Sequence, residues 1–132
     1  MSGRNEKEIR VLYVEDEVIL RDMVSEYLRM VGGYKVSCAE NGQEGVEIAQ
    51  SWKPHFILMD VRMPVMDGPE AIRILRAEPD MAQTPIYVLS AYSDHETVTT
   101  CEAAGADGFF TKPPNYHVIN STIKKVLQNK PS

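Results

Sequence analysis

The sequence has few of the features that mark zinc-binding, secreted or membrane-spanning proteins. It contains only two cysteines, Cys38 and Cys101, and they share no Cys/His spacing of the kind that binds zinc. No apolar run approaches the ~20 residues needed to cross a bilayer, and the first residues lack the apolar segment of a signal peptide. We therefore expect reduced thiols, no membrane span and a cytoplasmic protein.

Positive charge is also in short supply. The chain carries 14 Lys and Arg residues against 19 Asp and Glu residues, for a formal net charge of −5. A protein that binds nucleic acid usually has a basic face that neutralises phosphates, and this chain offers no such excess. We expect no direct contact with nucleic acid.

Length and composition favour one globular domain. A chain of 132 residues with 43% hydrophobic residues is long enough to bury a core without disulfides or metals. No linker or low-complexity tract divides it. We expect a single domain over residues 1–132, with its core at about 9–129.

Short apolar runs alternate with segments of helical period along the whole chain. Strands are expected at 9–14, 34–39, 56–59, 86–89 and 108–111. Five helices are expected between and after these strands. The first ends at Gly32-Gly33, the second runs from the cap Asn41 to Trp52, and the third spans 69–77. The fourth runs from the capping box Ser93–Glu96 to Gly105, and the fifth begins at Asn115. This alternation is typical of βα units on a parallel sheet and predicts a doubly wound α/β domain.

Two helices have apolar residues at three- and four-residue steps, which predicts one buried face on each. In the first helix this face consists of Leu20, Met23, Val24, Tyr27, Leu28 and Val31. In the last helix it consists of Val118, Ile119, Thr122, Ile123, Val126 and Leu127.

Polar residues follow four of the five expected strands. Glu15 and Asp16 come after the first strand and Asp60 after the third, while Ser90 and Lys112 follow the fourth and fifth. The carboxyl ends of parallel strands share one edge, so these side chains should meet there. Three carboxylates in one place repel one another unless a cation compensates, and oxygen ligands suit Mg²⁺ or Mn²⁺. With a lysine nearby, the edge predicts phosphate chemistry on a metal.

Four strings at these strand ends carry a family resemblance. They are VLYVEDE at 11–17, LMDVRMPVMDG at 58–68, VLSA at 88–91 and TKP at 111–113. With them, essentially the full chain resembles a response-regulator receiver domain of two-component signalling, of the chemotaxis-receiver kind. The resemblance implies a flavodoxin-like fold, with five parallel strands in the order 2-1-3-4-5 and five helices.

The resemblance also implies roles for the residues at the sheet edge. Asp60 would accept a phosphoryl group from a phosphohistidine. Glu15, Asp16 and Asp60 would hold Mg²⁺ together with the backbone carbonyl of Arg62. Lys112 would then pair with the phosphoryl oxygens.

After transfer, the resemblance implies a switch. The Ser90 hydroxyl and the Ala91 amide would bind the phosphoryl group, and the aromatic residue Phe109 would rotate inward. The Lys112-Pro113 bond would be cis. The change would alter the face formed by the last two helices and the strand between them.

The implied partners are a histidine kinase or a histidine phosphotransfer protein, as in a phosphorelay, and either a protein that binds the phosphorylated form or a missing output domain. The implied chemistry is limited to the chain's own phosphorylation and dephosphorylation, so it would not be an enzyme acting on other substrates.

Other functions remain to be weighed. An aspartate-nucleophile phosphatase of the haloacid-dehalogenase type needs a second aspartate two positions after Asp60, where Arg62 stands. A flavin-binding module needs a phosphate loop after the first strand, where the acidic run from Glu15 to Glu17 would repel a phosphate. Two further alternatives are a receiver domain that serves only as a scaffold and a receiver domain excised from a larger protein.

Overall fold

The sheet has five parallel strands, as expected from the sequence. In the computed structural model, residues 8–91 and 95–128 are described. The strands are β1 (Arg10–Val14), β2 (Lys35–Ala39), β3 (Phe56–Asp60), β4 (Ile86–Ala91) and β5 (Gly108–Lys112). They lie in the order β2-β1-β3-β4-β5, which confirms the predicted topology.

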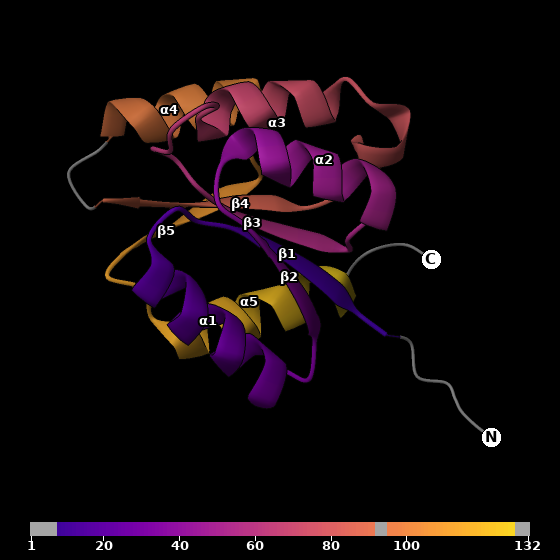
Figure 1. The fold of residues 1–132 in the computed structure, drawn as a ribbon, viewed down its shortest axis with the longest axis vertical. Helices are drawn as coiled ribbons and strands as arrows, with labels where there is room; N and C mark the ends of the chain where they lie inside the picture. Colours follow the sequence, from indigo (N-terminus) through magenta and orange to yellow (C-terminus); the bar gives the residue numbers. More distant parts are fainter. Residues whose placement is uncertain (1–7, 92–94, 129–132) are drawn as a thin grey trace.

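Helices cover both faces of this sheet (Figure 1). One face carries α1 (Val18–Met30) and α5 (Tyr116–Gln128), and the other carries α2 (Gly42–Trp52), α3 (Gly68–Arg76) and α4 (His95–Ala104). A short 3-10 helix, η2 (Pro79–Met81), precedes β4. No helix in the described part of the chain combines the length and the apolar character that a membrane span requires.

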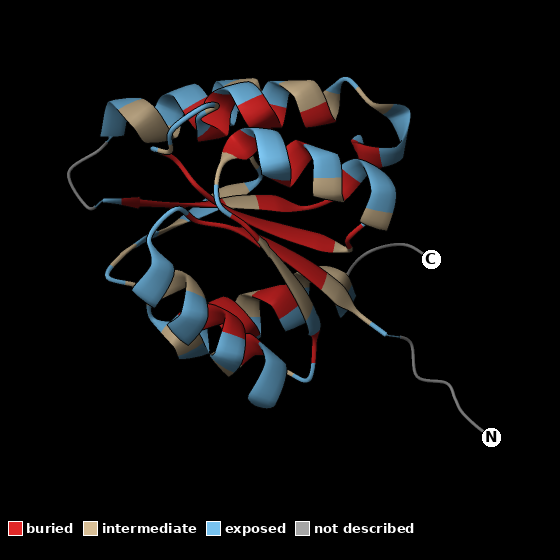
Figure 2. Ribbon diagram, viewed as in Figure 1, coloured by how far each residue is buried: buried red, intermediate tan, exposed pale blue. Residues whose placement is uncertain are grey.

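The strands supply the core on both sides of the sheet (Figure 2). All five residues of β3 are buried, because this strand lies at the centre and is covered by helices on both faces. Strand side chains alternate between the two faces, so Leu12 and Ile57 belong to one core while Tyr13 and Leu58 belong to the other.

Asparagine caps begin two of the helices. Asn41 Oδ1 accepts a hydrogen bond from the Glu44 N–H (2.9 Å), and Glu44 Oε1 accepts one from the Glu40 N–H (2.7 Å). At α5, Asn115 Oδ1 accepts from the Val118 N–H (3.1 Å), which confirms the predicted start. Ser93, the expected cap of α4, lies outside the described residues.

Three residues assigned to the buried helix faces are exposed, so this part of the prediction is wrong. Met23 is 51%, Val31 56% and Val118 44% exposed. The buried rows follow four-residue steps, through Val24 and Leu28 in α1, and Met23 lies about 100° around the helix from them. Val31 lies beyond the end of α1, and Val118 lies in the first turn of α5.

Strands β4 and β5 run further than expected, to Ala91 and Lys112. Their register pairs Ser90 with Thr111 and Ala91 with Lys112. Ser90, Ala91 and Lys112 of the predicted site are therefore part of the hydrogen-bonded sheet.

The turn after β3 is packed tightly against that strand. A Cβ on Gly68 would lie 2.8 Å from the Asp60 carbonyl oxygen and 3.1 Å from the Val61 Cα. The Gly68 N–H donates to the Val61 carbonyl at 2.8 Å, and this hydrogen bond holds the backbone of Gly68 against that of Val61. Only glycine fits this close approach.

We expect Gly68→Ala to lower the free energy of unfolding by roughly 1–3 kcal/mol, because the added methyl group meets backbone atoms rather than a flexible side chain. Urea denaturation followed by circular dichroism measures this. As a control, Glu70→Ala changes an exposed residue in the same first turn and should cost less than about 1 kcal/mol. Equal stability of the two variants would contradict the expectation.

Candidate functional site

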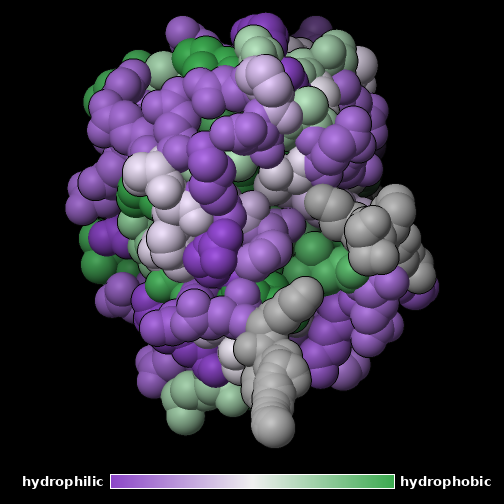
Figure 3. Space-filling view, turned by 90° about the vertical axis from the view of Figure 1, so that its right-hand side faces the viewer, coloured by the Kyte–Doolittle hydropathy of each residue, from purple (hydrophilic) through white to green (hydrophobic). Residues whose placement is uncertain are grey.

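The polar residues singled out from the sequence come together at the carboxyl edge of the sheet. Glu15 and Asp16 directly follow β1, Asp60 ends β3, Ser90 lies near the end of β4 and Lys112 ends β5. Oxygens of the first three residues all lie within 4.8 Å of one another. The opposite end of the molecule, where the strands begin, presents a mostly hydrophilic surface (Figure 3).

A shallow pocket of about 280 Å³ opens at this edge. Its lining consists of Asp16, Glu17, Asp60, Val61, Arg62, Ala91 and Lys112. Asp60 is only 5% exposed and lies at the bottom, whereas Asp16 is exposed at the mouth. A small polar molecule can therefore reach the Asp60 carboxylate from solvent.

Lys112 connects the buried carboxylates. Its Nζ lies 3.1 Å from Asp60 Oδ1 and 3.7 Å from Glu15 Oε2. Asp60 Oδ1 also accepts a hydrogen bond from the Val61 N–H at 2.9 Å, so one oxygen of this carboxylate is held by two donors. Burial by itself lowers the pKa of the Lys112 ammonium, but the charges of Asp60 and Glu15 outweigh it and leave that pKa raised.

The Asp60 carboxyl is strongly perturbed. Burial and the charge of Glu15 raise its pKa to about 7, although the charge and hydrogen bond of Lys112 act in the opposite direction. One ammonium group is too little positive charge for the carboxylates that surround it. A further cation would remove the imbalance.

The donor set suits a hard divalent cation. Carboxylate oxygens are the protein ligands that Mg²⁺ and Mn²⁺ take, and Mg²⁺ is usually bound by one or two carboxylates, waters and a phosphate. Glu15, Asp16 and Asp60 provide such oxygens within 4.8 Å of one another. The cluster could therefore bind a metal ion.

Of the remaining predicted residues, Arg62 and Ala91 line the pocket, whereas Ser90 does not. The buried Ser90 hydroxyl donates to the Ala91 carbonyl at 3.3 Å. The Lys112-Pro113 bond is cis, as the resemblance implied.

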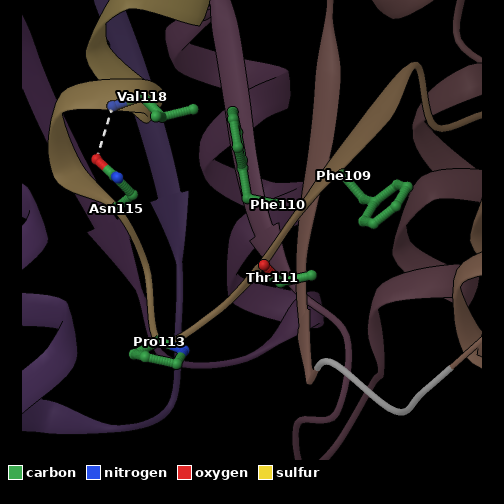
Figure 4. Close-up of a pocket in the computed structure, with 6 residues that line it drawn as sticks. All are labelled: Phe109, Phe110, Thr111, Pro113, Asn115 and Val118. Carbon is green, nitrogen blue, oxygen red and sulfur yellow. Dashed lines mark hydrogen bonds between the residues drawn. The ribbon is translucent and has the colours of Figure 1, made fainter.

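Phe109 lies outside the pocket. It is 46% exposed, and Figure 4 shows it and Phe110 on opposite sides of β5. Phe110 is partly buried and stacks on Tyr87, with ring centroids 5.4 Å apart. Phe109, Phe110 and Val118 contribute to a second hollow of about 320 Å³ between β5 and α5. Phe109 therefore borders a hollow that is separate from the acidic pocket.

Two residues of the site were missed in the sequence analysis. Glu17 lines the pocket, and the buried Tyr13 donates from its hydroxyl to Glu15 Oε1 at 3.0 Å. The signal for Tyr13 was available, because residues two apart in a strand point to the same side. Its hydroxyl group could have been read as a partner for Glu15.

Known proteins resemble this chain over most of its length. The model of the response regulator receiver domain matches residues 11–124. The chemotaxis response regulator CheY4 of Vibrio cholerae has a similar structure, with a TM-score of 0.84 and 34% identity over 91% of this chain and 99% of that one. The receiver domain of the sensor histidine kinase PA1611 from Pseudomonas aeruginosa, solved with magnesium coordinated in its active-site cleft, has a TM-score of 0.79 and 30% identity, with 92% and 96% of the two chains covered.

The curated relatives are longer proteins. A cyclic di-GMP phosphodiesterase of Thermotoga maritima is 36% identical over 120 residues, which make up 91% of this chain but 31% of the relative. The first three relatives are covered over 31%, 25% and 49% of their length. The similarity therefore concerns one part of those proteins.

In metal-free protein, we expect Asp60→Asn to raise the free energy of unfolding by roughly 1–2 kcal/mol at pH 8. The pKa of the Asp60 carboxyl in the folded protein, about 7, exceeds its ordinary value. The native state therefore binds the proton more tightly, and the wild type loses stability as the pH rises from about 4 through 7. Asparagine carries no charge and avoids this loss.

Urea denaturation in EDTA at pH 5 and pH 8 tests this, and the gain should be larger at pH 8. Asp80→Asn is the control, because the exposed Asp80 carboxylate pairs with Lys53 and should give no such gain. An Asp60→Asn protein that is less stable than the wild type at both pH values would contradict the argument.

Proposed function

Because this chain belongs to the response-regulator receiver domain family of two-component signalling, we propose that it accepts a phosphoryl group on the Asp60 carboxylate. Phosphoryl acceptance is the general function of that family. The observation that carries the assignment to Asp60 is its burial at the bottom of an open pocket, 3.1 Å from Lys112 Nζ and within 4.8 Å of Glu15 and Asp16 oxygens. Membership of the family removes the phosphatase and flavin-binding alternatives.

The donor in this proposal is the phosphohistidine of a histidine kinase or a histidine phosphotransfer protein. A carboxylate oxygen of Asp60 attacks the phosphorus, the P–N bond breaks, and its electron pair returns to the imidazole as the new P–O bond forms. A carboxylate is a weak nucleophile that faces an anionic donor, so charge neutralisation matters more than a general base.

Residues of the pocket divide this task. Glu15, Asp16, Asp60 and the backbone carbonyl of Arg62 would hold Mg²⁺, or Mn²⁺ in its place. When bound, the ion supplies positive charge against the phosphoryl oxygens. Lys112, charged and already close to Asp60 and Glu15, pairs with the same oxygens from the other side.

The signal leaves the pocket through β4 and β5. The Ser90 hydroxyl and the Ala91 amide bind the transferred group, and Phe109 turns from its exposed position toward the space that Ser90 vacates. These movements change the face formed by α4, β5 and α5. The readout is a protein that binds this face or an output domain; we propose no nucleic-acid contact. A cytoplasmic location remains a prediction.

We propose that the chain catalyses only its own phosphorylation and dephosphorylation. Incubation with acetyl phosphate and Mg²⁺, followed by intact mass spectrometry, should therefore give a gain of one phosphoryl group that EDTA prevents. Asp60→Asn should show no gain. Asp80→Asn, which removes an exposed aspartate far from the pocket, should be labelled like the wild type. Equal labelling of wild type and Asp60→Asn would remove Asp60 from its role.

We further expect Ser90→Ala to keep the labelling and to weaken the switch, because the hydroxyl acts after transfer. Addition of beryllofluoride and Mg²⁺ should shift the amide resonances of 108–112 and 116–128 in the wild type. In Ser90→Ala these shifts should be clearly smaller, while resonances next to Asp60 still respond. Shifts of wild-type size would show that the signal takes another route.

A further inference from the structure

The Tyr13 side chain reaches the acidic pocket from inside the protein. Tyr13 is fully buried in β1, and its hydroxyl donates to Glu15 Oε1 at 3.0 Å. The Glu15 N–H continues the ladder between β1 and β2 by donating to the Ala39 carbonyl at 2.9 Å, so the extended backbone persists to Glu15. Residues two apart in an extended chain point the same way, which explains why the hydroxyl meets the carboxylate.

We propose that Tyr13 is a positioning residue: its hydroxyl holds the Glu15 carboxylate in the one orientation in which that group serves a Mg²⁺ ion in the pocket. The proposal rests on the function proposed above. It assigns to a core tyrosine an effect on metal affinity and on the choice between metals. Tyr13 itself does not touch the ion or the phosphoryl group.

The two oxygens of Glu15 are held separately. Oε1 accepts from the Tyr13 hydroxyl, while Oε2 accepts from the Glu17 N–H at 3.3 Å and lies 3.7 Å from Lys112 Nζ. Glu15 is 0% exposed, so bulk water cannot replace a lost partner. Because different donors bind the two oxygens, the carboxylate cannot rotate without breaking a hydrogen bond.

The Tyr13 hydroxyl is a reliable donor. A phenol is a hydrogen-bond donor that keeps its proton at neutral pH. The only hydrogen-bond acceptor of the Tyr13 hydroxyl among the described contacts is Glu15 Oε1. The hydroxyl therefore donates to the charged Glu15 carboxylate and stabilises it, and no second acceptor among the described contacts draws the hydroxyl away.

Loss of this hydrogen bond should affect Mg²⁺ more than Ca²⁺. Mg²⁺ demands near-ideal octahedral geometry, whereas Ca²⁺ accepts irregular arrangements with longer distances. Removal of a group that orients a metal ligand commonly weakens binding 10- to 100-fold. Since the Glu17 N–H still holds Oε2, we expect the lower end of this range, about tenfold, for Tyr13→Phe.

The test is isothermal titration calorimetry of the whole chain with Mg²⁺ and, separately, with Ca²⁺. Tyr13→Phe should bind Mg²⁺ about tenfold more weakly and Ca²⁺ only slightly more weakly. Tyr34→Phe is the matched control, because Tyr34 is buried in the same core and its hydroxyl has no hydrogen-bond partner in the described structure. It should bind both ions like the wild type.

A second variant keeps the test independent of any loss of stability. Glu15→Asp shortens the side chain by one methylene group and takes the carboxylate out of reach of the Tyr13 hydroxyl. In that background, Tyr13→Phe should change Mg²⁺ affinity less than twofold, because the interaction is already lost. A further tenfold loss would show that Tyr13 acts by another route and would overturn the proposal.

The remaining outcomes separate this proposal from the one before it. If Tyr13→Phe binds Mg²⁺ as tightly as the wild type, or loses Mg²⁺ and Ca²⁺ affinity equally, the positioning role is wrong while Asp60 labelling stands. If the wild type binds no Mg²⁺ and acetyl phosphate does not label it, the proposed function fails, and the positioning role fails with it.

Discussion

Two buried carboxylates, Glu15 and Asp60, lie next to a single ammonium group, that of Lys112, and the properties of the site follow from this arrangement. Lys112 lies within 3.7 Å of one carboxylate and 3.1 Å of the other, and Asp16 adds a third negative charge at the mouth. The excess of negative charge raises the pKa of Asp60 and makes the pocket receptive to a cation. An anionic phosphoryl donor can approach such a pocket only when that charge is neutralised.

The sheet makes this unfavourable arrangement possible. Glu15 follows β1, and Asp60 and Lys112 end β3 and β5. Most residues of β1 and all residues of β3 are buried, chiefly among apolar side chains. The hydrophobic core holds the strands in place, so the carboxylates cannot separate to relieve their repulsion. The tight turn at Gly68 packs against the backbone of Asp60 and Val61, two residues that line the pocket. The stability of the core therefore offsets the repulsion between the carboxylates at the edge.

Local sequence signals predicted most of the elements. The apolar run before Asp60, the cap Asn41 and the stop at Gly105 all mark the expected boundaries, because they depend on backbone geometry within a few residues. The errors concern which residues of the helices are buried. Met23 and Val118 are apolar and have helical spacing, yet both are exposed, because spacing alone does not say which row of a helix meets the sheet.

The order of strands and helices, the polar residues after four of the strands and the family relationship can all be read from the amino-acid sequence. These follow from side-chain chemistry and short-range backbone preferences. The distances, the burial of Asp60 and the exposure of Phe109 emerge only from the folded arrangement. Such quantities depend on the register of strands that are distant in the chain, and no local pattern specifies that register to within the length of a hydrogen bond.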